Sequence, residues 1–389
     1  MNNKVARREI PFGRPMIGDE ERAAVLKVLE SPQLVHGPAA KAFESAFAAS
    51  LGPGAHATSV SSCTAGLHLA YMHLGIGPGD EVIVPAETHV ATAHAVEITG
   101  ARPIFVDSDP KTGNLDTTKV RAAVTGRTKA ICVVHYLGLP VPMDEVLAVA
   151  RERKLLVVED CALAIGGSLD GVACGLLGDV SSFSFYPVKH MTTAEGGMVV
   201  SRHADVVASI ENIKAFGYDR TLAERKVPGV YDIARLGINY RMNEIAAAIG
   251  LVQLKRLPAF ARSRNENARA LRGLLSGVDE LTLLPDGDAR ATHANYCLGV
   301  VLGDTVGTRR AEIITELKEH GVGASVHYPV PLPLSKYYKA KYGADASAFP
   351  HSVRISSRSI ALPIGPHLTP DDMSVIADGL KAAINKWKS

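Results

Sequence analysis

Short apolar runs that recur along the first half of the chain constrain its fold more than any other feature. Four of these runs lie roughly 20–30 residues apart, which is the spacing of repeated strand–helix–strand units. They are EVIVPA (81–86), PIFVD (103–107), KAICVVHY (129–136) and KLLVVED (154–160). Because the runs are apolar on both faces, we expect strands of a mostly parallel sheet that helices cover on both sides.

The spacing of the apolar residues changes further along the chain. The runs VSSFSFY (180–186) and GGMVVS (196–201) lie closer together, so a turn rather than a helix is predicted between them. From about residue 240 the apolar spacing is helical, and Pro258 is predicted to end the first of these helices. The last helix is predicted to start near Thr369, with that residue as its N-cap.

These patterns predict an α/β fold in two parts. Residues 1–250 are expected to form a large α/β domain with a mostly parallel sheet, and residues 251–389 a smaller α+β domain. The N-terminal segment is a candidate for packing on the smaller domain.

Composition and charge exclude several classes of protein. Of the 389 residues 47% are hydrophobic, and the net charge is only +2, which gives no support for nucleic acid as a partner. No apolar stretch reaches eighteen residues and the N-terminus is polar, so neither a membrane span nor a signal peptide is expected. The five cysteines form no CxxC pair, so we expect reduced thiols in a cytoplasmic protein rather than disulfides or a metal site.

Four polar features fall at strand ends or helix starts, where open α/β sheets bind ligands. The run SSCT (61–64) precedes an amphipathic helix and is typical of a phosphate site or of a plain N-cap. Asp160 ends an apolar run, and Lys189 follows another; alone, the first suggests a cap and the second a surface lysine. Asn239 and Arg241 precede a helix and fit caps or loop supports equally well.

Together these features are more specific than any one of them. A phosphate-binding helix start, a strand-end aspartate and a lysine about thirty residues later are what pyridoxal phosphate requires. Its phosphate needs N–H and hydroxyl donors, its ring nitrogen needs a carboxylate, and its aldehyde needs an amine. The sequence therefore predicts a pyridoxal-phosphate site.

Several blocks of the sequence resemble the DegT/DnrJ/EryC1/StrS family of pyridoxal-phosphate sugar aminotransferases, which have the type I fold. The blocks span nearly the whole chain: FGRPMIGDEE, SSCTAGLHLA, PAETHVATAHAV, VVEDCALAIG, SFYPVKHMTTAEGG, LGINYRMNEIAAAIGLVQLKRL and SVHYPVPLPLSKYY. By this resemblance Lys189 is the cofactor-anchoring lysine and Asp160 is the partner of the ring nitrogen. Thr64 and Ala65 match the phosphate-binding pair at a helix start, and Ser184 matches a hydroxyl that also reaches the phosphate.

The resemblance also implies a substrate pocket and a dimer. His327 matches a residue near the sugar, and Asn239 matches one that reaches the phosphate from the neighbouring subunit of a homodimer. Three positions depart from the family pattern. His89 stands where an aromatic residue usually stacks on the cofactor ring, Cys63 replaces a glycine of the phosphate loop, and Leu163 replaces a polar residue.

The activity that the resemblance implies is transfer of the amino group of glutamate to a keto group of a nucleotide-linked sugar. The TTAEGG block after the lysine is similar to that of 4-keto-6-deoxy sugar enzymes, which supply aminosugars for surface polysaccharides such as lipopolysaccharide or for secondary metabolites. Three alternatives stay open: a sugar dehydratase, an aminocyclitol aminotransferase, and a regulatory protein that binds the cofactor without turnover. His190 suggests the dehydratase, but its spacing to TTAEGG places Lys189 at the anchoring position.

Overall fold

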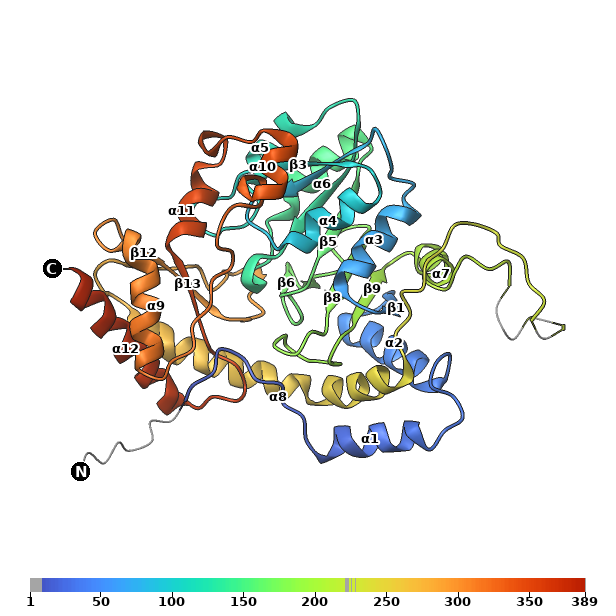
Figure 1. Ribbon diagram of the computed structural model, residues 1–389, viewed down its shortest axis with the longest axis horizontal. Helices are drawn as coiled ribbons and strands as arrows, with labels where there is room; N and C mark the ends of the chain where they lie inside the picture. The colour runs from blue at the N-terminus through green and yellow to red at the C-terminus, as the bar shows by residue number, and fades with distance from the viewer. Residues whose placement is uncertain (1–8, 221–223, 225, 228, 389) are drawn as a thin grey trace.

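A seven-stranded sheet forms the centre of the computed structural model, which describes residues 9–220, 224, 226–227 and 229–388 (Figure 1). The strand order is β1-β9-β8-β5-β4-β2-β3. The strands are β1 (His56–Val60), β2 (Glu81–Pro85), β3 (Arg102–Val106), β4 (Thr128–Val134), β5 (Leu156–Asp160), β8 (Val180–Ser184) and β9 (Gly197–Ser201). Strands β3, β2, β4, β5 and β8 pair in parallel, and β9 runs antiparallel between β8 and β1. The six predicted strands and the mostly parallel sheet are confirmed, and β1 is an edge strand that the sequence did not signal.

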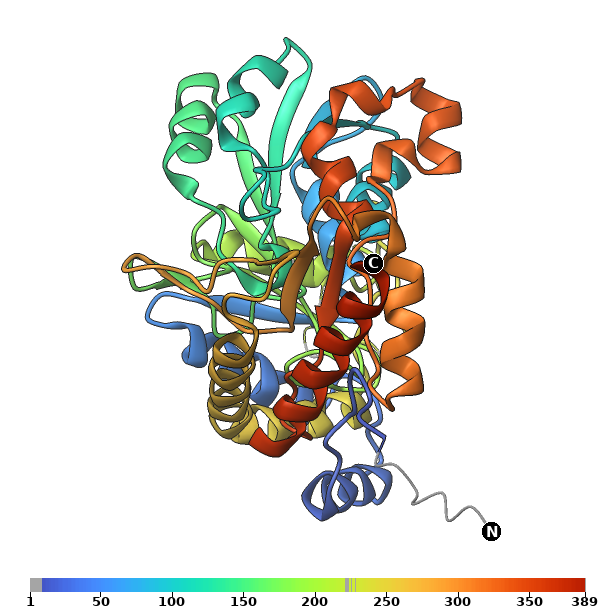
Figure 2. The ribbon, with the colours of Figure 1, turned by 90° about the vertical axis from the view of Figure 1, so that its left-hand side faces the viewer.

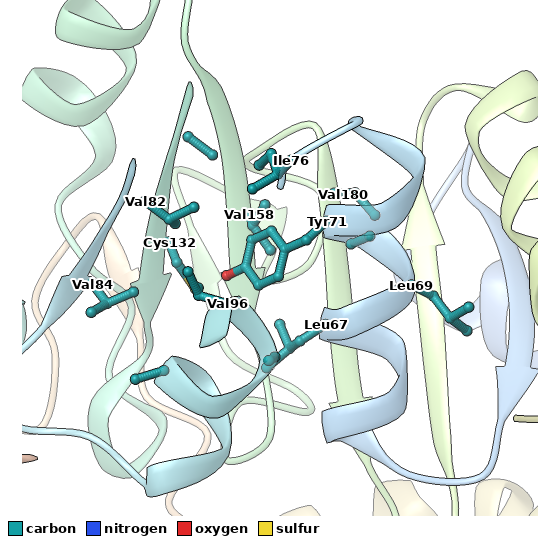
Figure 3. Packing of buried hydrophobic residues seen from close by; sticks show 14 of the residues in the cluster. Leu67, Leu69, Tyr71, Ile76, Val82, Val84, Val96, Cys132, Val158 and Val180 are labelled. Atoms are coloured by element: carbon teal, nitrogen blue, oxygen red, sulfur yellow. The ribbon is translucent and has the colours of Figure 1, made fainter. Parts of the chain in front are cut away.

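Helices cover both faces of this sheet, as the two-sided apolar runs predicted. They are α2 (Pro38–Leu51), α3 (Cys63–His73), α4 (Val90–Ile98), α5 (Thr117–Ala123), α6 (Met143–Arg153) and α7 (Ala204–Ile213), with η1 (Tyr136–Gly138) after β4. Figure 3 shows Leu67 and Tyr71 of α3 packed toward Val82, Cys132 and Val158 of three neighbouring strands. The alternate strand residues face α5 and α6 on the other side.

A second core lies in the C-terminal part of the chain. Its antiparallel sheet has the order β10-β12-β13, from Leu281–Leu283, Leu298–Leu302 and Ser359–Leu362. Helices α9 (Arg310–Glu319) and α12 (Pro370–Lys388) lie side by side against it, orange and red in Figure 2. Ile10 joins this core and exchanges backbone hydrogen bonds with Gly321 and Gly323, so the N-terminal segment packs on the C-terminal part.

Helix α8 (Glu244–Leu275) connects the two cores and corrects one prediction. Pro258 lies inside this helix and does not end it. A proline removes one hydrogen bond of the helix, but α8 packs on α1 (Asp19–Leu29) and α2 before the proline and on α12 after it. The packing on both sides outweighs the lost bond. The predicted domain boundary at residue 250 falls inside α8, and we keep the division into two domains as a proposal that rests on the two separate cores.

The remaining elements connect these layers. They are β6 (Ser168–Leu169), β7 (Val172–Ala173) and β11 (Ala291–Thr292), which form a small sheet, and η3 (Gly307–Arg309), η4 (Leu332–Leu334), α10 (Lys336–Tyr342), η5 (Ala346–Ala348) and α11 (Pro350–Arg358). The last helix begins at Pro370, directly after Thr369 as predicted, although the hydroxyl of Thr369 donates to Asp372. In the part of the chain that the structure describes, no helix combines the length and apolarity needed to span a bilayer.

Candidate active site

The candidate site lies at one edge of the large sheet, where several segments end together. Strands β2, β5 and β8 are parallel, so their carboxyl ends share that edge. Strand β5 ends at Asp160, β8 ends at Ser184 five residues before Lys189, and β2 leads into the loop that carries His89. Helix α3 begins beside them at Cys63. The fold therefore brings together residues that are far apart in the sequence.

Lys189 is a mostly buried amine and not a surface lysine. Burial lowers its pKa below the usual lysine range, and the neighbouring Cys63, Asp160 and Cys297 only partly oppose this shift. Its Nζ lies 5.3 Å from the centre of the Tyr296 ring. A lowered pKa raises the fraction of neutral amine, which is the nucleophilic form.

Asp160 is buried and held by three donors. Its Oδ2 accepts a hydrogen bond from the Thr92 hydroxyl at 2.8 Å, and its Oδ1 accepts one from the Ala162 amide at 3.1 Å. The Cys63 thiol lies 3.7 Å from the same Oδ1. The hydroxyl oxygens of Thr88 and Thr92 are 2.7 Å apart. Because the Thr92 hydroxyl donates its proton to Asp160, the Thr88 hydroxyl is the donor to Thr92. The carboxylate therefore has a fixed orientation inside the site.

The start of α3 supplies the candidate phosphate site. Thr64 lies in the first turn of the helix, where backbone N–H groups and the helix dipole favour an anion. Ser62 is the N-cap, and it already accepts a hydrogen bond from the Ala65 amide at 3.1 Å. Ser184 is buried at the end of β8. A side chain at Gly197 would lie within 2.7 Å of backbone atoms of Ser62 and Cys63, so glycine allows β9 to approach the helix start closely.

His89 has a second role that its position in the sequence did not reveal. It is the N-cap of α4, and its Nδ1 accepts a hydrogen bond from the Ala91 amide at 3.2 Å. Its ring centre lies 5.7 Å from that of Tyr328, and partial burial lowers its pKa. Leu163, another departure from the family pattern, is buried in an apolar cluster that includes Tyr136 and Cys297. An apolar residue therefore suits that position in this chain.

His327 contacts the aromatic rings of Phe12, Tyr296 and Tyr328. Its ring centre is 5.5 Å from that of Tyr296 and 5.7 Å from that of Phe12, and the Tyr136 hydroxyl donates to its backbone oxygen. Burial, together with the positive charge of Lys189, lowers the pKa of His327 to about 4. The structure thus places His327 beside Lys189 as a neutral imidazole, whose buried Nδ1 has no partner among the described residues.

The structure adds three aromatic residues to the candidate site. Phe12, Tyr296 and Tyr328 form an aromatic wall with His327. Phe12 and Tyr296 are single aromatic residues in segments far from His327, and Tyr328 directly follows His327; none has a distinctive sequence signal. Asn239 is exposed and pairs through its backbone with Ala215. The next residue, Tyr240, accepts a hydrogen bond from the Ser61 amide, so this segment lies beside the start of α3.

A second buried cluster, formed by His135, Glu159 and Cys161, has the ligand types of a metal site. Glu159 Oε2 lies 2.9 Å from His135 Nε2 and accepts a hydrogen bond from the Gly175 amide at 2.8 Å. Glu159 Oε1 accepts one from the Gly178 amide at 2.7 Å. The carboxylate therefore fastens the loop before β8 to the sheet. This cluster supports the fold beneath the site.

The donor set around Lys189 fits pyridoxal phosphate. The helix start with Thr64 and the hydroxyl of Ser184 suit a phosphate, and the oriented Asp160 carboxylate suits a protonated ring nitrogen. The amine of Lys189, with its lowered pKa, suits an aldehyde. The phosphate, the ring nitrogen and the aldehyde of the cofactor therefore each have a counterpart among these residues.

Comparisons with known proteins give the same result. The profile of the DegT/DnrJ/EryC1/StrS aminotransferase family matches residues 15–381. The chain is 36% identical to the spore coat polysaccharide biosynthesis protein SpsC of Bacillus subtilis, over 96% of each chain. The aminotransferase TlmJ of Streptoalloteichus hindustanus is 34% identical, with a TM-score of 0.89, over 98% of this chain and all of TlmJ. The putative sugar aminotransferase Spr1654 of Streptococcus pneumoniae in its PLP-form is 27% identical, with a TM-score of 0.91, over 98% of this chain and all of Spr1654. The chain therefore belongs to the DegT/DnrJ/EryC1/StrS family and is a pyridoxal-phosphate-dependent aminotransferase.

Proposed function

We propose that this enzyme transfers the amino group of glutamate to the keto group of a nucleotide-linked 4-keto-6-deoxy sugar. The observation that carries the proposal is the meeting of the buried Lys189 amine, the oriented Asp160 carboxylate and the aromatic wall with His327 in one site. The family and the printed names of SpsC and Spr1654 support a sugar as the acceptor. The TTAEGG block supports amination at C4.

Each polar residue of the site has a distinct role in this proposal. Pyridoxal phosphate, when bound, supplies an electron sink for the carbon that loses a proton. Lys189 would hold the aldehyde of the cofactor through its amine and would move a proton as the general base. Asp160 would accept a hydrogen bond from the ring nitrogen and stabilise its positive charge. Thr64, Ala65 and Ser184 hold the phosphate.

The contacts of His190 favour amino transfer over the dehydratase alternative. His190 is buried, its Nε2 lies 2.9 Å from the Ala294 carbonyl oxygen, and burial holds its pKa well below the usual histidine range. Lys189, the residue before it, is the one whose amine interacts with the charge of Asp160. We therefore assign the anchoring role to Lys189.

A panel of nucleotide-linked 4-keto and 3-keto sugars, incubated with ¹⁵N-glutamate, tests the proposal. Mass spectrometry should detect ¹⁵N in a 4-amino sugar, and reactions without glutamate serve as controls. Labelling of a 3-amino sugar or an aminocyclitol would correct the substrate. Loss of water without incorporation of nitrogen would point to a dehydratase, and no change in the cofactor spectrum with glutamate would exclude glutamate as the donor.

A homodimer with shared sites is the second part of the proposal. The described stretches between α7 and α8 stand out from the body of the protein (Figure 1) and expose large apolar side chains, Leu236 by 79%. Further exposed apolar residues in this segment and in the N-terminal part are Leu26, Leu29, Leu34, Val35, Phe216, Val227, Val230, Tyr231 and Ile233. Apolar surface of this extent favours association with another protein surface. A second copy would also account for the exposed position of Asn239.

Subunit mixing tests the shared site. Lys189→Ala and Asn239→Ala, if each is inactive alone, should regain activity when their subunits exchange, because one site of the heterodimer then has both residues. The recovered rate should approach one quarter of that of the unaltered protein, from the statistics of random exchange. No recovery despite exchange shown by native mass spectrometry would contradict a site shared through Asn239.

His89 variants test whether its ring packs on the cofactor. His89→Ala should weaken binding of pyridoxal phosphate by about 1 kcal/mol, roughly fivefold, because the ring contact is lost. His89→Phe should keep that affinity but lower the free energy of unfolding by about 1 kcal/mol, because phenylalanine cannot act as the N-cap of α4. Cofactor titration and denaturant unfolding measure the two effects. Equal loss of turnover in both variants with unchanged cofactor affinity would instead indicate an acid–base role.

We also propose that the enzyme works in the cytoplasm. All five cysteines are buried and free, which fits a reducing compartment.

A further inference from the structure

Glu87 is a buried carboxylate next to the site that none of the roles above uses. It lies in the loop between β2 and α4, directly before Thr88 and His89, and is 1% exposed. It accepts a hydrogen bond from the Tyr328 amide through Oε1 at 2.7 Å, and one from the Ser356 hydroxyl through Oε2. Both donors belong to the C-terminal part of the chain. Glu87 therefore joins the large sheet to the segment that carries His327.

The residues that Glu87 joins line the two sides of the site. On its own loop, Thr88 leads through Thr92 to the Asp160 carboxylate, and the His89 ring lies 5.7 Å from that of Tyr328. A displacement of either partner of Glu87 would therefore move groups that contact the cofactor.

Charged and titratable groups surround Glu87 on several elements. Arg310, at the start of α9, donates to the Ser356 backbone oxygen and attracts the carboxylate, whereas Asp107, after β3, repels it. The hydroxyl groups of Tyr136 and Tyr328 are also close. Burial raises the pKa of Glu87 to about 7, although Ser356, Tyr328 and Arg310 lower it in part. The carboxyl group therefore changes its charge near neutral pH.

We propose that Glu87 is a positioning residue whose charged form holds the His89 loop against the His327–Tyr328 segment and thereby strengthens cofactor binding. Hydrogen bonds to a carboxylate are stronger than those to a neutral acid or amide. When Glu87 takes up a proton, one oxygen becomes a donor and the contact to both partners weakens. Affinity for pyridoxal phosphate should therefore fall as the pH drops through about 7.

Titration of the cofactor-free protein with pyridoxal phosphate between pH 6 and 8.5 tests this proposal. The dissociation constant of the unaltered protein for pyridoxal phosphate should rise by about three- to tenfold toward low pH, because hydrogen bonds to the charged carboxylate are stronger than those to the neutral acid. Glu87→Gln should have the weaker affinity at pH 8.5 already and lack that rise. The cofactor's own titrations are common to all variants, so they cancel in the comparison.

Asp107→Asn is the matched control. Asp107 is also buried at a strand end and accepts hydrogen bonds from the amide and hydroxyl of Ser352 in α11 at 2.8 and 2.7 Å, but it makes neither of the contacts that join Glu87 to Tyr328 and Ser356. Because the charge of Asp107 raises the pKa of Glu87, this variant should keep the pH-dependent rise but move it to lower pH. If Glu87→Gln keeps the rise as well, or if both variants lose it, the proposal is wrong.

A second variant and a second measurement cover the case in which Glu87→Gln binds poorly for other reasons. Ser356→Ala removes a donor that lowers the pKa of Glu87, so the rise in the dissociation constant should remain but move to higher pH.

The folded pKa of Glu87 lies above its value of 4.5 in the unfolded chain, so its ionisation costs stability as the pH rises from about 4.5 through about 7. The melting temperature of Glu87→Gln relative to the unaltered protein should therefore increase over that range. A difference in melting temperature that does not change with pH would contradict the role of Glu87. So would a rise in the dissociation constant that occurs at the same pH in Ser356→Ala as in the unaltered protein.

Discussion

Lys189→Ala is expected to lower turnover by about 10³-fold or more, because the variant loses both the covalent anchor and the general base. The site should keep its shape, since the amine contributes a contact to the Tyr296 ring rather than a structural hydrogen bond. Steady-state assays with the labelled amino donor measure the loss. Circular dichroism and the melting temperature show whether the fold survives.

A matched lysine variant makes this result specific. Lys111 is exposed in the turn before α5, so Lys111→Ala should leave turnover unchanged. Bound pyridoxal phosphate in Lys189→Ala should absorb as the free aldehyde, because the lysine that is expected to react with it has been removed. A comparable rate in Lys189→Ala and the unaltered protein would contradict the assignment of the anchor.

Asp160→Asn is expected to have the second largest effect. The amide oxygen can still accept the Thr92 or Ala162 hydrogen bond, but it no longer places a negative charge beside the ring nitrogen. Proton transfer should slow by about 10²-fold or more, as when a charge-stabilising group is removed from an active site. The decay of the cofactor absorbance after addition of glutamate, followed in a single turnover, measures this step.

Asp107→Asn again provides the comparison, since Asp107 is a buried aspartate directly after β3 of the same sheet. It should react at the rate of the unaltered protein. Equal slowing in the two variants would indicate that a buried aspartate at this sheet edge matters for stability alone. A normal single-turnover rate in Asp160→Asn would show that Asp160 is only a turn residue.

The sheet was predictable because its strands carry their own signal. Runs such as KLLVVED are apolar on both faces and short, and the structure has β5 at Leu156–Asp160. The strand-end positions of Asp160 and Ser184 followed from the same runs. Pro258 shows the limit of local patterns: tertiary packing along α8 outweighed a residue that ordinarily ends a helix.

Much of the site could not be predicted because it depends on contacts between distant segments. Glu87 accepts from Tyr328, 241 residues away in the sequence, and the Tyr136 hydroxyl donates to the backbone of His327. No local pattern marks such pairs. His89 could be matched to an aromatic position, but its N-cap bond to Ala91 depends on where α4 begins, which only the structure shows.

One measurement tests directly whether Lys189 is the lysine that anchors the cofactor. The unaltered protein, loaded with pyridoxal phosphate, is reduced with sodium borohydride, digested and analysed by peptide mass spectrometry. We expect a phosphopyridoxyl group on Lys189, in the peptide that contains SFYPVKHMTTAEGG. Attachment to another lysine, or an unmodified Lys189 in fully loaded protein, would contradict it.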